Sequence, residues 1–494
     1  MESPELAKRH GSPIHVEVAN TFAVVALCLF ALYSVAATVS LRYRLKTDRV
    51  FNIVKSPIFL TLLWTALCVA AIFWHFQASM LQIARRYGQL SIASATISVV
   101  LSLKPAPLPQ TFHVPLVSIH KWVGRSSILF ASIHGFTYAI SFIKQASSST
   151  EKRHEGHHHN PFSTFNIFGM ISLAAFIIIL VSSLKFVRRR AYGLFYALHR
   201  PLVILIYILM IWHARPSSPL LIGVGLAVMA AQIIIRALLT CRLTVTNVEQ
   251  FGTNLKLVSF KCDSGFFDLG TANHPGSYIR VAAPIFSPLE FFRPSHPYTL
   301  AGNGTLVVRE SRFILSTKRD YCAFGPFYTP LDLTPSTKVL IIAGGSGISM
   351  APTIVNKAQS ECRLVWVTRS ASEVQILPRL GIKDCDVFIT GDTFKDEEAA
   401  FELDDIQEEE EIENENENEN ENEEEQSSFL SNSVRYGAAG IHRHRGRPNL
   451  DEAAKSLQDP NVLIIACGPE SLVNDVRLFA THHNYTFWSE VYAL

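Results

Sequence analysis

Two stretches decide the fold: HKWVGRSSILFASIH at residues 120–134 and HRPLVILIYILMIWH at residues 199–213. Each lies in an apolar segment long enough to span a bilayer, and each begins and ends with a histidine. Over the fourteen residues between the two histidines, a helix turns back to within about 40° of its starting face and rises about 21 Å. Each helix therefore presents two imidazoles at two depths in the membrane. Facing imidazole pairs favour haem, so we predict two b-type haems, one held by His120 and His199 and the other by His134 and His213.

The first half of the chain has the composition of a membrane protein. Residues 1–240 contain only six acidic residues, all in or near connecting segments. We predict an N-terminal tail over residues 1–17 and a multi-pass α-helical membrane domain over residues 18–240. Its candidate spans are residues 18–41, 57–80, 89–103, 114–142, 165–185, 195–213 and 219–240. The third is the shortest and ends at a cluster of prolines.

The charge distribution indicates membrane topology. The formal net charge is +2, but residues 396–425 hold 18 acids and no Lys or Arg, which leaves an excess of 20 positive charges elsewhere. Because those cations gather at the ends of apolar spans, they indicate orientation and argue against nucleic-acid binding. The bias places the second half of the chain in the cytosol, with His120 and His199 at the cytosolic level. The eight cysteines contain no close Cys-x-x-Cys pair, so neither a disulfide framework nor a zinc site is indicated.

The second half alternates short strands and helices. Alternating stretches broken by Gly, Pro and Asn predict an antiparallel β-barrel over residues 241–335. A βα pattern with a parallel sheet follows over residues 336–494. Residues 393–445 interrupt this pattern with an acidic, Asn-alternating tract and a basic tail, which we predict to be a disordered insertion.

The motif His120-Lys-Trp-x-Gly124-Arg125 and the two His-x13-His pairs resemble the ferric reductase and NADPH oxidase family of transmembrane electron-transfer proteins. The likeness extends over nearly the whole chain except the tail and the insertion. Within the family, the seven spans are most similar to the fungal probable metalloreductases, one yeast member of which is regarded as an NADPH oxidase. The resemblance implies a cytosolic ferredoxin-NADP reductase-like module that binds FAD in the barrel and NADPH in the α/β domain.

The barrel contains the segment that would bind the flavin. His296-Pro297-Tyr298-Thr299 resembles the family's His-Pro-Phe-Thr motif, which supplies an aromatic ring and a hydroxyl to FAD. Arg309 ends a predicted strand and is placed to bind the FAD pyrophosphate. An ordinary strand end is the competing interpretation of this cluster.

The dinucleotide site is indicated by its local pattern. A strand at residues 339–343 leads into Gly344-Gly345-Ser346-Gly347-Ile348-Ser349, and a predicted helix follows. Glycines allow the backbone to approach a pyrophosphate, and the helix N-terminus donates N–H groups to it. The next strand ends in Arg369-Ser370 where an NAD-specific site would have an acid, which favours NADPH. A solvated strand end is the alternative for Arg369.

Two C-terminal motifs extend the resemblance. Cys467-Gly468-Pro469 ends another buried strand and resembles the family's nicotinamide-site motif; a buried structural thiol is the alternative. The family resemblance also implies an aromatic ring near the C-terminus that covers the flavin, for which Trp488 and Tyr492 are the candidates.

These patterns predict a transmembrane oxidoreductase that passes electrons from NADPH through FAD and two haems to an acceptor beyond the lipid. Ferric or cupric ions are the first choice, and dioxygen, with superoxide as product, is the alternative. His154 and His157–His159 form either an outer metal-binding cluster or a solvated loop. A non-catalytic scaffold whose acidic insertion binds a basic protein is a third possibility. The plasma membrane and the endoplasmic reticulum both fit the sequence.

Overall fold

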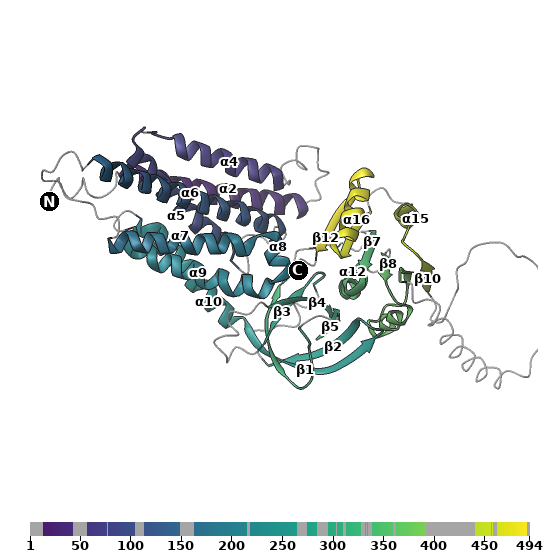
Figure 1. Ribbon diagram of the computed structural model, residues 1–494. Coiled ribbons are helices and arrows are strands. Elements are labelled where there is room, and N and C mark those ends of the chain that lie inside the picture. The colour runs from purple at the N-terminus through teal and green to yellow at the C-terminus, as the bar shows by residue number, and fades with distance from the viewer. Residues whose placement is uncertain are drawn as a thin grey trace, which may run out of the picture. The chain divides into compact units, whose positions relative to one another are not determined.

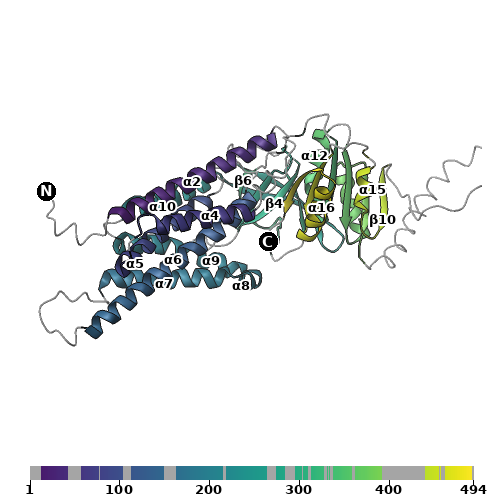
Figure 2. The same cartoon turned by 90° about the horizontal axis from the view of Figure 1, so that it is seen from above.

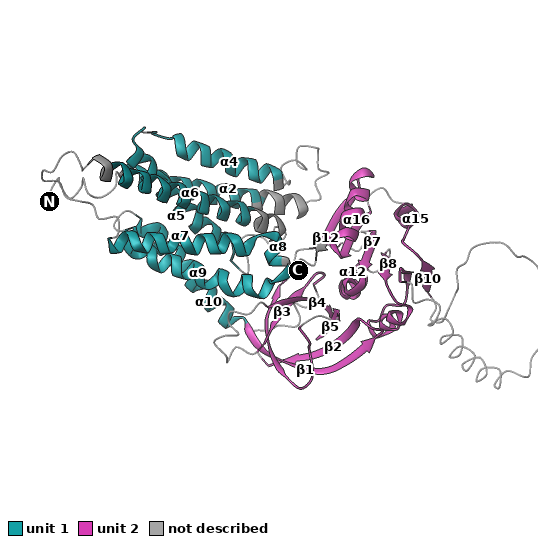
Figure 3. Ribbon diagram, in the orientation of Figure 1, with its two compact units in different colours: residues 1–239, 285–294 teal, residues 240–284, 295–494 magenta. Residues whose placement is uncertain are grey.

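The structure is a computed structural model that describes residues 13–42, 57–76, 78–103, 113–148, 163–214, 218–263, 274–283, 295–302, 304–309, 313–327, 331, 333, 338–358, 362–391, 440–455, 457 and 462–491. The chain divides into two compact units (Figure 3). Unit 1 comprises Met1–Leu239 with Ile285–Pro294, and unit 2 comprises Thr240–Pro284 with Ser295–Leu494.

Unit 1 is a helical bundle (Figure 1). Its helices are α2 (Pro13–Arg42), α4 (Pro57–Phe73), α5 (Met80–Leu101), α6 (His113–Ser148), α7 (Thr164–Ser183), α8 (Lys185–Arg190), α9 (Tyr192–His213) and α10 (Pro219–Leu238). Among the described residues, five helices are long and apolar enough to cross a membrane, namely α2, α6, α7, α9 and α10, and α4 is a shorter apolar helix. A helix occurs at each of the seven predicted spans.

The surface of unit 1 fits a lipid environment. Nearly all the exposed large apolar side chains among the described residues belong to this unit; in unit 2 only Ile314 and Leu478 are of this kind. An exposed apolar surface of that extent is stable in lipid and not in water. The multi-pass helical membrane domain expected from the sequence is therefore confirmed.

Helix α5 differs most from its prediction. The span expected at residues 89–103 begins about two and a half turns earlier, at Met80. Its first turns carry Arg85 and Arg86, which hide an apolar pattern. Arg86 is nevertheless only 4% exposed, because its guanidinium donates to His15 Nδ1 at 2.9 Å and to the carbonyl oxygens of Ala71 and Trp74 at 2.8 and 2.7 Å. Helix α5 lies inside the bundle, in contact with α2, α4, α6 and α10.

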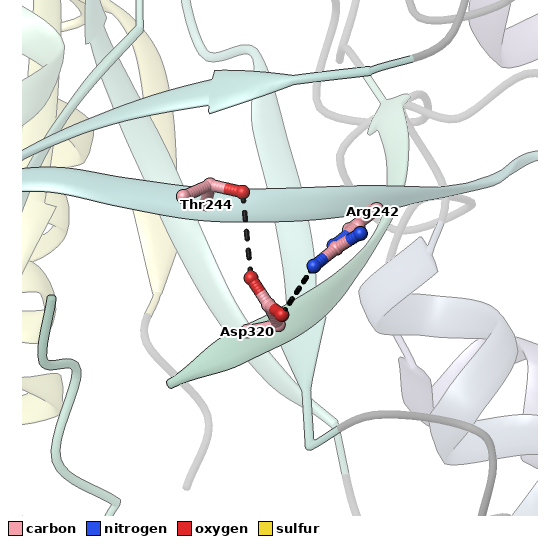
Figure 4. Close-up of polar contacts among 3 residues, drawn as sticks. All are labelled: Arg242, Thr244 and Asp320. Carbon is pink, nitrogen blue, oxygen red and sulfur yellow. Dashed lines mark hydrogen bonds and ion pairs between the residues drawn. The ribbon is translucent and has the colours of Figure 1, made fainter. Parts of the chain in front are cut away.

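Unit 2 begins with a closed barrel of order β1-β2-β5-β4-β3-β6. Its antiparallel strands are β1 (Thr240–Phe251), β2 (Leu255–Cys262), β3 (Tyr278–Ala282), β4 (His296–Gly302), β5 (Thr305–Arg309) and β6 (Asp320–Phe327). Strands β1 and β6 close the barrel, and across that seam Asp320 accepts hydrogen bonds from Arg242 at 2.6 Å and Thr244 at 3.5 Å (Figure 4). Leu243, Ile279, Leu306 and Ala323 are fully buried in its core.

The rest of unit 2 is a six-stranded parallel sheet of order β10-β9-β8-β7-β11-β12. Its elements are β7 (Val339–Gly344), η3 (Gly345–Met350), α12 (Ala351–Ala358), β8 (Cys362–Thr368), η4 (Ala371–Gln375), α13 (Ile376–Arg379), β9 (Cys385–Ile389), β10 (Ile441–Arg445), α15 (Leu450–Lys455), β11 (Leu463–Gly468), α16 (Glu470–His482) and β12 (Thr486–Val491). Every residue of β7 and β11 is buried, as central parallel strands require. Helix α12 packs on one face, and α15 and α16 pack on the other (Figure 2).

The position of strand β10 shows that the predicted disordered insertion extended too far at its C-terminal end. The sequence analysis assigned residues 393–445 to one disordered segment, but Ile441–Arg445 pairs in parallel with Cys385–Ile389 at the edge of the sheet. The basic composition hid this strand, because only Ile441 among its five residues is apolar and buried. Residues 392–439, which hold the acidic tract, lie outside the described residues.

Candidate functional site

The four histidines of the bundle form two facing pairs between α6 and α9. The ring centroids of His120 and His199 are 6.3 Å apart, and those of His134 and His213 are 6.0 Å apart. Two metal–nitrogen bonds of about 2 Å, with about 1.1 Å from each nitrogen to its ring centre, require about 6.2 Å between imidazoles that share one metal ion. Both pairs therefore have the separation that two axial ligands of one iron need.

Backbone carbonyls fix the tautomer of three of these rings. The Nδ1 atoms of His120, His134 and His213 lie 2.9, 2.8 and 2.7 Å from the carbonyl oxygens of Ser98, Ala84 and Phe165. A carbonyl oxygen only accepts, so each Nδ1 carries the proton and each Nε2 keeps the lone pair that binds metal. His199 differs, because its buried Nδ1 has no hydrogen-bond partner among the described residues.

Two glycines make room for the rings of His134 and His213, here called the outer pair; His120 and His199 are the inner pair. A Cβ atom added at Gly88 on α5 would lie 2.7 Å from His134 Nδ1, and one at Gly169 on α7 would lie 2.4 Å from His213 Cε1. Any larger residue would therefore displace these rings. Neither glycine was predicted from the sequence, where a glycine in an apolar helix was the only signal.

A cavity of about 1240 Å³ surrounds the outer pair. Its lining includes His134, His213, Gly88, Gly169 and the apolar side chain of Phe176. Ser172 also lines it, is 1% exposed, and has a hydroxyl oxygen without a partner among the described atoms. A large, mainly apolar space between two opposed imidazoles fits a planar macrocycle.

Other metal sites are not found in the described part of the chain. No group of three or more His, Cys, Asp or Glu side chains gathers there in a way that would hold an ion without a macrocycle. The predicted outer cluster of His154 and His157–His159 lies outside the described residues.

Beside the inner pair, the Arg200 guanidinium lies over the ring of Tyr196, at 4.7 Å.

Strand β4 carries the predicted flavin residues of unit 2. His296, Pro297, Tyr298 and Thr299 occupy its first four positions, and Thr299 is 2% exposed. The His296 ring stacks on Phe313 with centroids 4.4 Å apart, and burial followed by the charge of Arg280 lowers the pKa of His296. Burial raises the pKa of Tyr298, so its phenol stays neutral. Arg309 is exposed at the end of β5.

The glycine turn lies against this part of the barrel. The turn forms η3, which holds Gly345 to Ser349 and contacts both β4 and β5. The predicted flavin and nucleotide residues of unit 2 therefore come together in one region, as hydride transfer between the two cofactors requires.

Gly344 and the Cys467 motif meet at the carboxyl ends of neighbouring strands. In parallel strands β7 and β11, Ala343 is in register with Cys467. A Cβ at Gly347 would lie 2.3 Å from the Cys467 carbonyl oxygen, and one at Gly344 would lie 2.9 Å from Pro469. The chain order reverses between these two strands, and open α/β sheets bind ligands at such a point.

Trp488 is placed between the barrel and the sheet of unit 2. It lies in β12, in register with Ile465, and the nearest atom of its indole is 3.3 Å from the Cβ position of Gly276 before β3. Trp488 thus lies beside the start of β3, the strand that pairs with β4. Tyr492 lies outside the described residues.

Arg369 and Ser370 follow β8 at the same edge of the sheet. Arg369 is exposed, whereas Ser370 is 8% exposed and its hydroxyl lies 2.7 Å from that of Ser372. The nearby acid Glu373 is 5% exposed and accepts a hydrogen bond from Thr368. Among the described residues, this edge therefore presents the exposed Arg369, and the nearby acid Glu373 is buried.

Comparison with known proteins agrees with this arrangement. Residues 87–211 match the family model described as ferric reductase like transmembrane component, and residues 336–481 match the ferric reductase NAD binding domain. The fold and these matches define a membrane-bound oxidoreductase with a nucleotide-binding domain. The chain belongs to the ferric reductase family.

Two similar relatives carry the same name. The chain is 30% identical to probable metalloreductase AIM14 of Yarrowia lipolytica, over 99% of this chain and 100% of that protein. It is 30% identical to the protein of the same name in Debaryomyces hansenii, over 90% and 89% of the two chains. Among solved structures, the ferredoxin reductase in carbazole 1,9a-dioxygenase is similar over 51% of this chain and 69% of its own, with 15% identity and a TM-score of 0.34.

Proposed function

We propose that the protein passes electrons from cytosolic NADPH through FAD and two b-type haems to ferric or cupric ions on the other side of the membrane. The observation that carries the proposal is the pair of His–His separations, 6.3 and 6.0 Å, with Nδ1 bound to a carbonyl in three of the four rings. The names of the relatives support metal ions as the acceptor.

Each cofactor has residues that fit it. His120 with His199, and His134 with His213, would hold haem iron from both sides, and bis-His ligation leaves no open position for a substrate. Haem when bound carries one electron at a time, and FAD when bound converts the two-electron donor into single electrons. Tyr298, Thr299 and Arg309 would bind the flavin. Two ferric ions are reduced for each NADPH oxidised, with release of NADP⁺ and one proton.

NADPH is proposed over NADH because of the charge at the sheet edge. Arg369 is exposed there, whereas Glu373 is buried and already bonded to Thr368. A guanidinium binds a phosphate by paired hydrogen bonds and gives a free ribose hydroxyl no comparable advantage. The positive flanks of the membrane spans support a cytosolic location for unit 2, in either the plasma membrane or the endoplasmic reticulum.

Membranes from cells that express the protein test this function. They should receive NADPH with a ferric chelate, a cupric salt or dioxygen, and ferrous ion, cuprous ion and superoxide should be measured separately. We expect NADPH-dependent metal reduction that continues under anaerobic conditions. Superoxide as the sole product would overturn the metal assignment and favour an NADPH oxidase. No reduction of any acceptor, together with absent b-type haem bands, would favour a scaffold.

A further inference from the structure

Two thiols of the barrel lie in contact at one end of its first two strands. Cys241 is the second residue of β1, and Cys262 is the last residue of β2. Cys262 is in register with Leu243, so its side chain lies on the same face as those of Leu243 and Cys241. All three pack in the barrel core, where Cys241 is 4% exposed and Cys262 is partly exposed. Both cysteines are free thiols.

Hydrogen bonds gather on the sulfur of Cys241. The Cys262 thiol donates one, and the backbone N–H groups of Cys241 itself and of Ala323 donate two more. These donors stabilise a thiolate and hold the pKa of Cys241 below its ordinary value, although burial and the charge of Asp263 act in the opposite direction. The same thiol–thiol contact, followed by burial, raises the pKa of Cys262. The pair therefore consists of one sulfur that ionises first and one protonated partner in contact with it.

We propose that Cys241 and Cys262 form a redox-sensitive site that hydrogen peroxide closes to a disulfide. This site goes beyond the proposed function and does not depend on it. A single buried thiol is usually an ordinary core residue, whereas two thiols in contact, one ionisable and the other reaching the surface, can react with each other. Because Cys241 is almost completely buried, a small hydroperoxide fits as the oxidant and a bulky disulfide does not.

The chemistry needs one molecule of hydrogen peroxide for each pair of thiols. The Cys241 thiolate attacks a peroxide oxygen, which forms an S–O bond and breaks the O–O bond, and the released hydroxide takes up a proton to leave as water. The Cys262 sulfur then attacks the Cys241 sulfur, which forms the S–S bond and breaks the S–O bond, and a second water leaves. The two thiols lose two electrons and two protons, and the peroxide is reduced to two waters.

The crosslink would act at the start of the barrel. Cys241 lies three residues after Leu238, the last residue of α10. Among the described residues, the pairing of β1 with β2 ends at Leu243 and Cys262, apart from one hydrogen bond from Asp263 N to the Arg242 oxygen at 3.2 Å. A disulfide would therefore continue the connection between these two strands with a covalent bond.

Peptide mapping of the oxidised protein tests the proposal. Trypsin separates the two thiols, because Cys241 lies in the peptide Ala237–Arg242 and Cys262 lies in Cys262–Arg280. Full-length protein in detergent should be reduced, freed of reductant, treated with hydrogen peroxide, alkylated and digested. We expect most of the two peptides to be recovered as one disulfide-linked species that dithiothreitol abolishes. Absence of this species after peroxide treatment would overturn the proposal.

Cys322→Ala is the matched control. Cys322 is also partly exposed, but it is in register with Arg242 on β1, so it faces away from Cys241. The substitution should leave the yield of the linked species unchanged. In the wild type, linkage of Cys241 to the Cys322 peptide as often as to the Cys262 peptide would show unspecific oxidation and would also overturn the proposal.

Single variants identify the attacking sulfur. In Cys262→Ala the sulfenic acid on Cys241 meets no partner thiol, so dimedone should label Cys241 after peroxide treatment. In Cys241→Ala, dimedone labelling of Cys262 should be lost. Labelling of Cys262 alone would contradict the order of the two steps. Thermal unfolding in detergent checks that each variant is folded, and the mapping of the wild type requires no substitution.

Discussion

At the residue scale, the outer histidines are held by what surrounds them. His134 and His213 each donate Nδ1–H to a backbone carbonyl, and Gly88 and Gly169 leave space for their rings. The carbonyls fix where each Nε2 points, and the glycines allow the helices to approach. The geometry of the pair therefore depends on two residues that bind nothing themselves.

A single methyl group should disturb that geometry. In Gly169→Ala the new Cβ would lie 2.4 Å from the His213 ring, so we expect the ring to shift and about half or more of the b-type haem absorbance to be lost. Reduced-minus-oxidised spectra of purified protein measure this. Gly223→Ala is the control, since nothing lies within 4 Å of its Cβ position on α10. Equal haem content in both variants would contradict the role given to Gly169.

His296 gives the barrel a pH dependence. Burial and Arg280 lower the pKa of His296 below its ordinary 6.5, so the unfolded chain binds more protons than the folded one just below pH 6.5. Its contribution to stability is complete above pH 6.5 and is lost as the pH falls through the lowered folded pKa. We expect the temperature of flavin release to fall between pH 6.5 and 5.5, and His296→Gln to reduce that slope. An identical slope in both proteins would refute the assignment.

At the element scale, helix α5 organises the bundle. Its Arg86 binds His15 on α2 and two carbonyls at the end of α4 and just beyond it, so one buried cation joins three helices. A cation at the C-terminal end of a helix also favours the helix dipole. The first turns of α5 therefore connect α5 with α2 and α4 through one buried guanidinium.

Removal of this cation should loosen unit 1. Arg86→Leu loses three hydrogen bonds and leaves the carbonyl oxygens of Ala71 and Trp74 without this donor, which should cost about 2 kcal/mol or more. The midpoint of thermal unfolding in detergent should fall by several degrees. Arg85→Leu, on the same helix but partly exposed, should change it little. Equal midpoints for the two variants would show that the Arg86 contacts contribute nothing.

The sequence predicts helices and strands well where a single hydrophobic periodicity dominates the segment. The histidine spacing, the glycine turn and the apolar runs of β7 and β11 are local signals, and the helical bundle, barrel and parallel sheet follow from them. The start of α5 and strand β10 were missed, because Arg86 and the basic residues of β10 are accommodated only by tertiary contacts. The same reason applies to Gly88 and Gly169, whose neighbours come from other helices.

At the scale of the whole molecule, the reduction of the flavin and the reduction of the acceptor can be measured separately. His134→Ala removes one ligand from the outer pair, in unit 1, and changes no residue of unit 2. We expect it to abolish acceptor reduction while NADPH still reduces the flavin at the wild-type rate, as followed by flavin absorbance. His75→Ala, at a histidine outside both pairs, is the control. Loss of flavin reduction in His134→Ala would contradict the proposed order.

The central claim is that two porphyrin irons, each between opposed imidazoles, connect the flavin domain to the far side of the lipid. The most direct test is the ratio of haem to flavin in purified full-length protein, measured by pyridine haemochrome and by released FAD. Two b-type haems for each FAD is the predicted result. A folded, flavin-containing protein without haem would contradict the account.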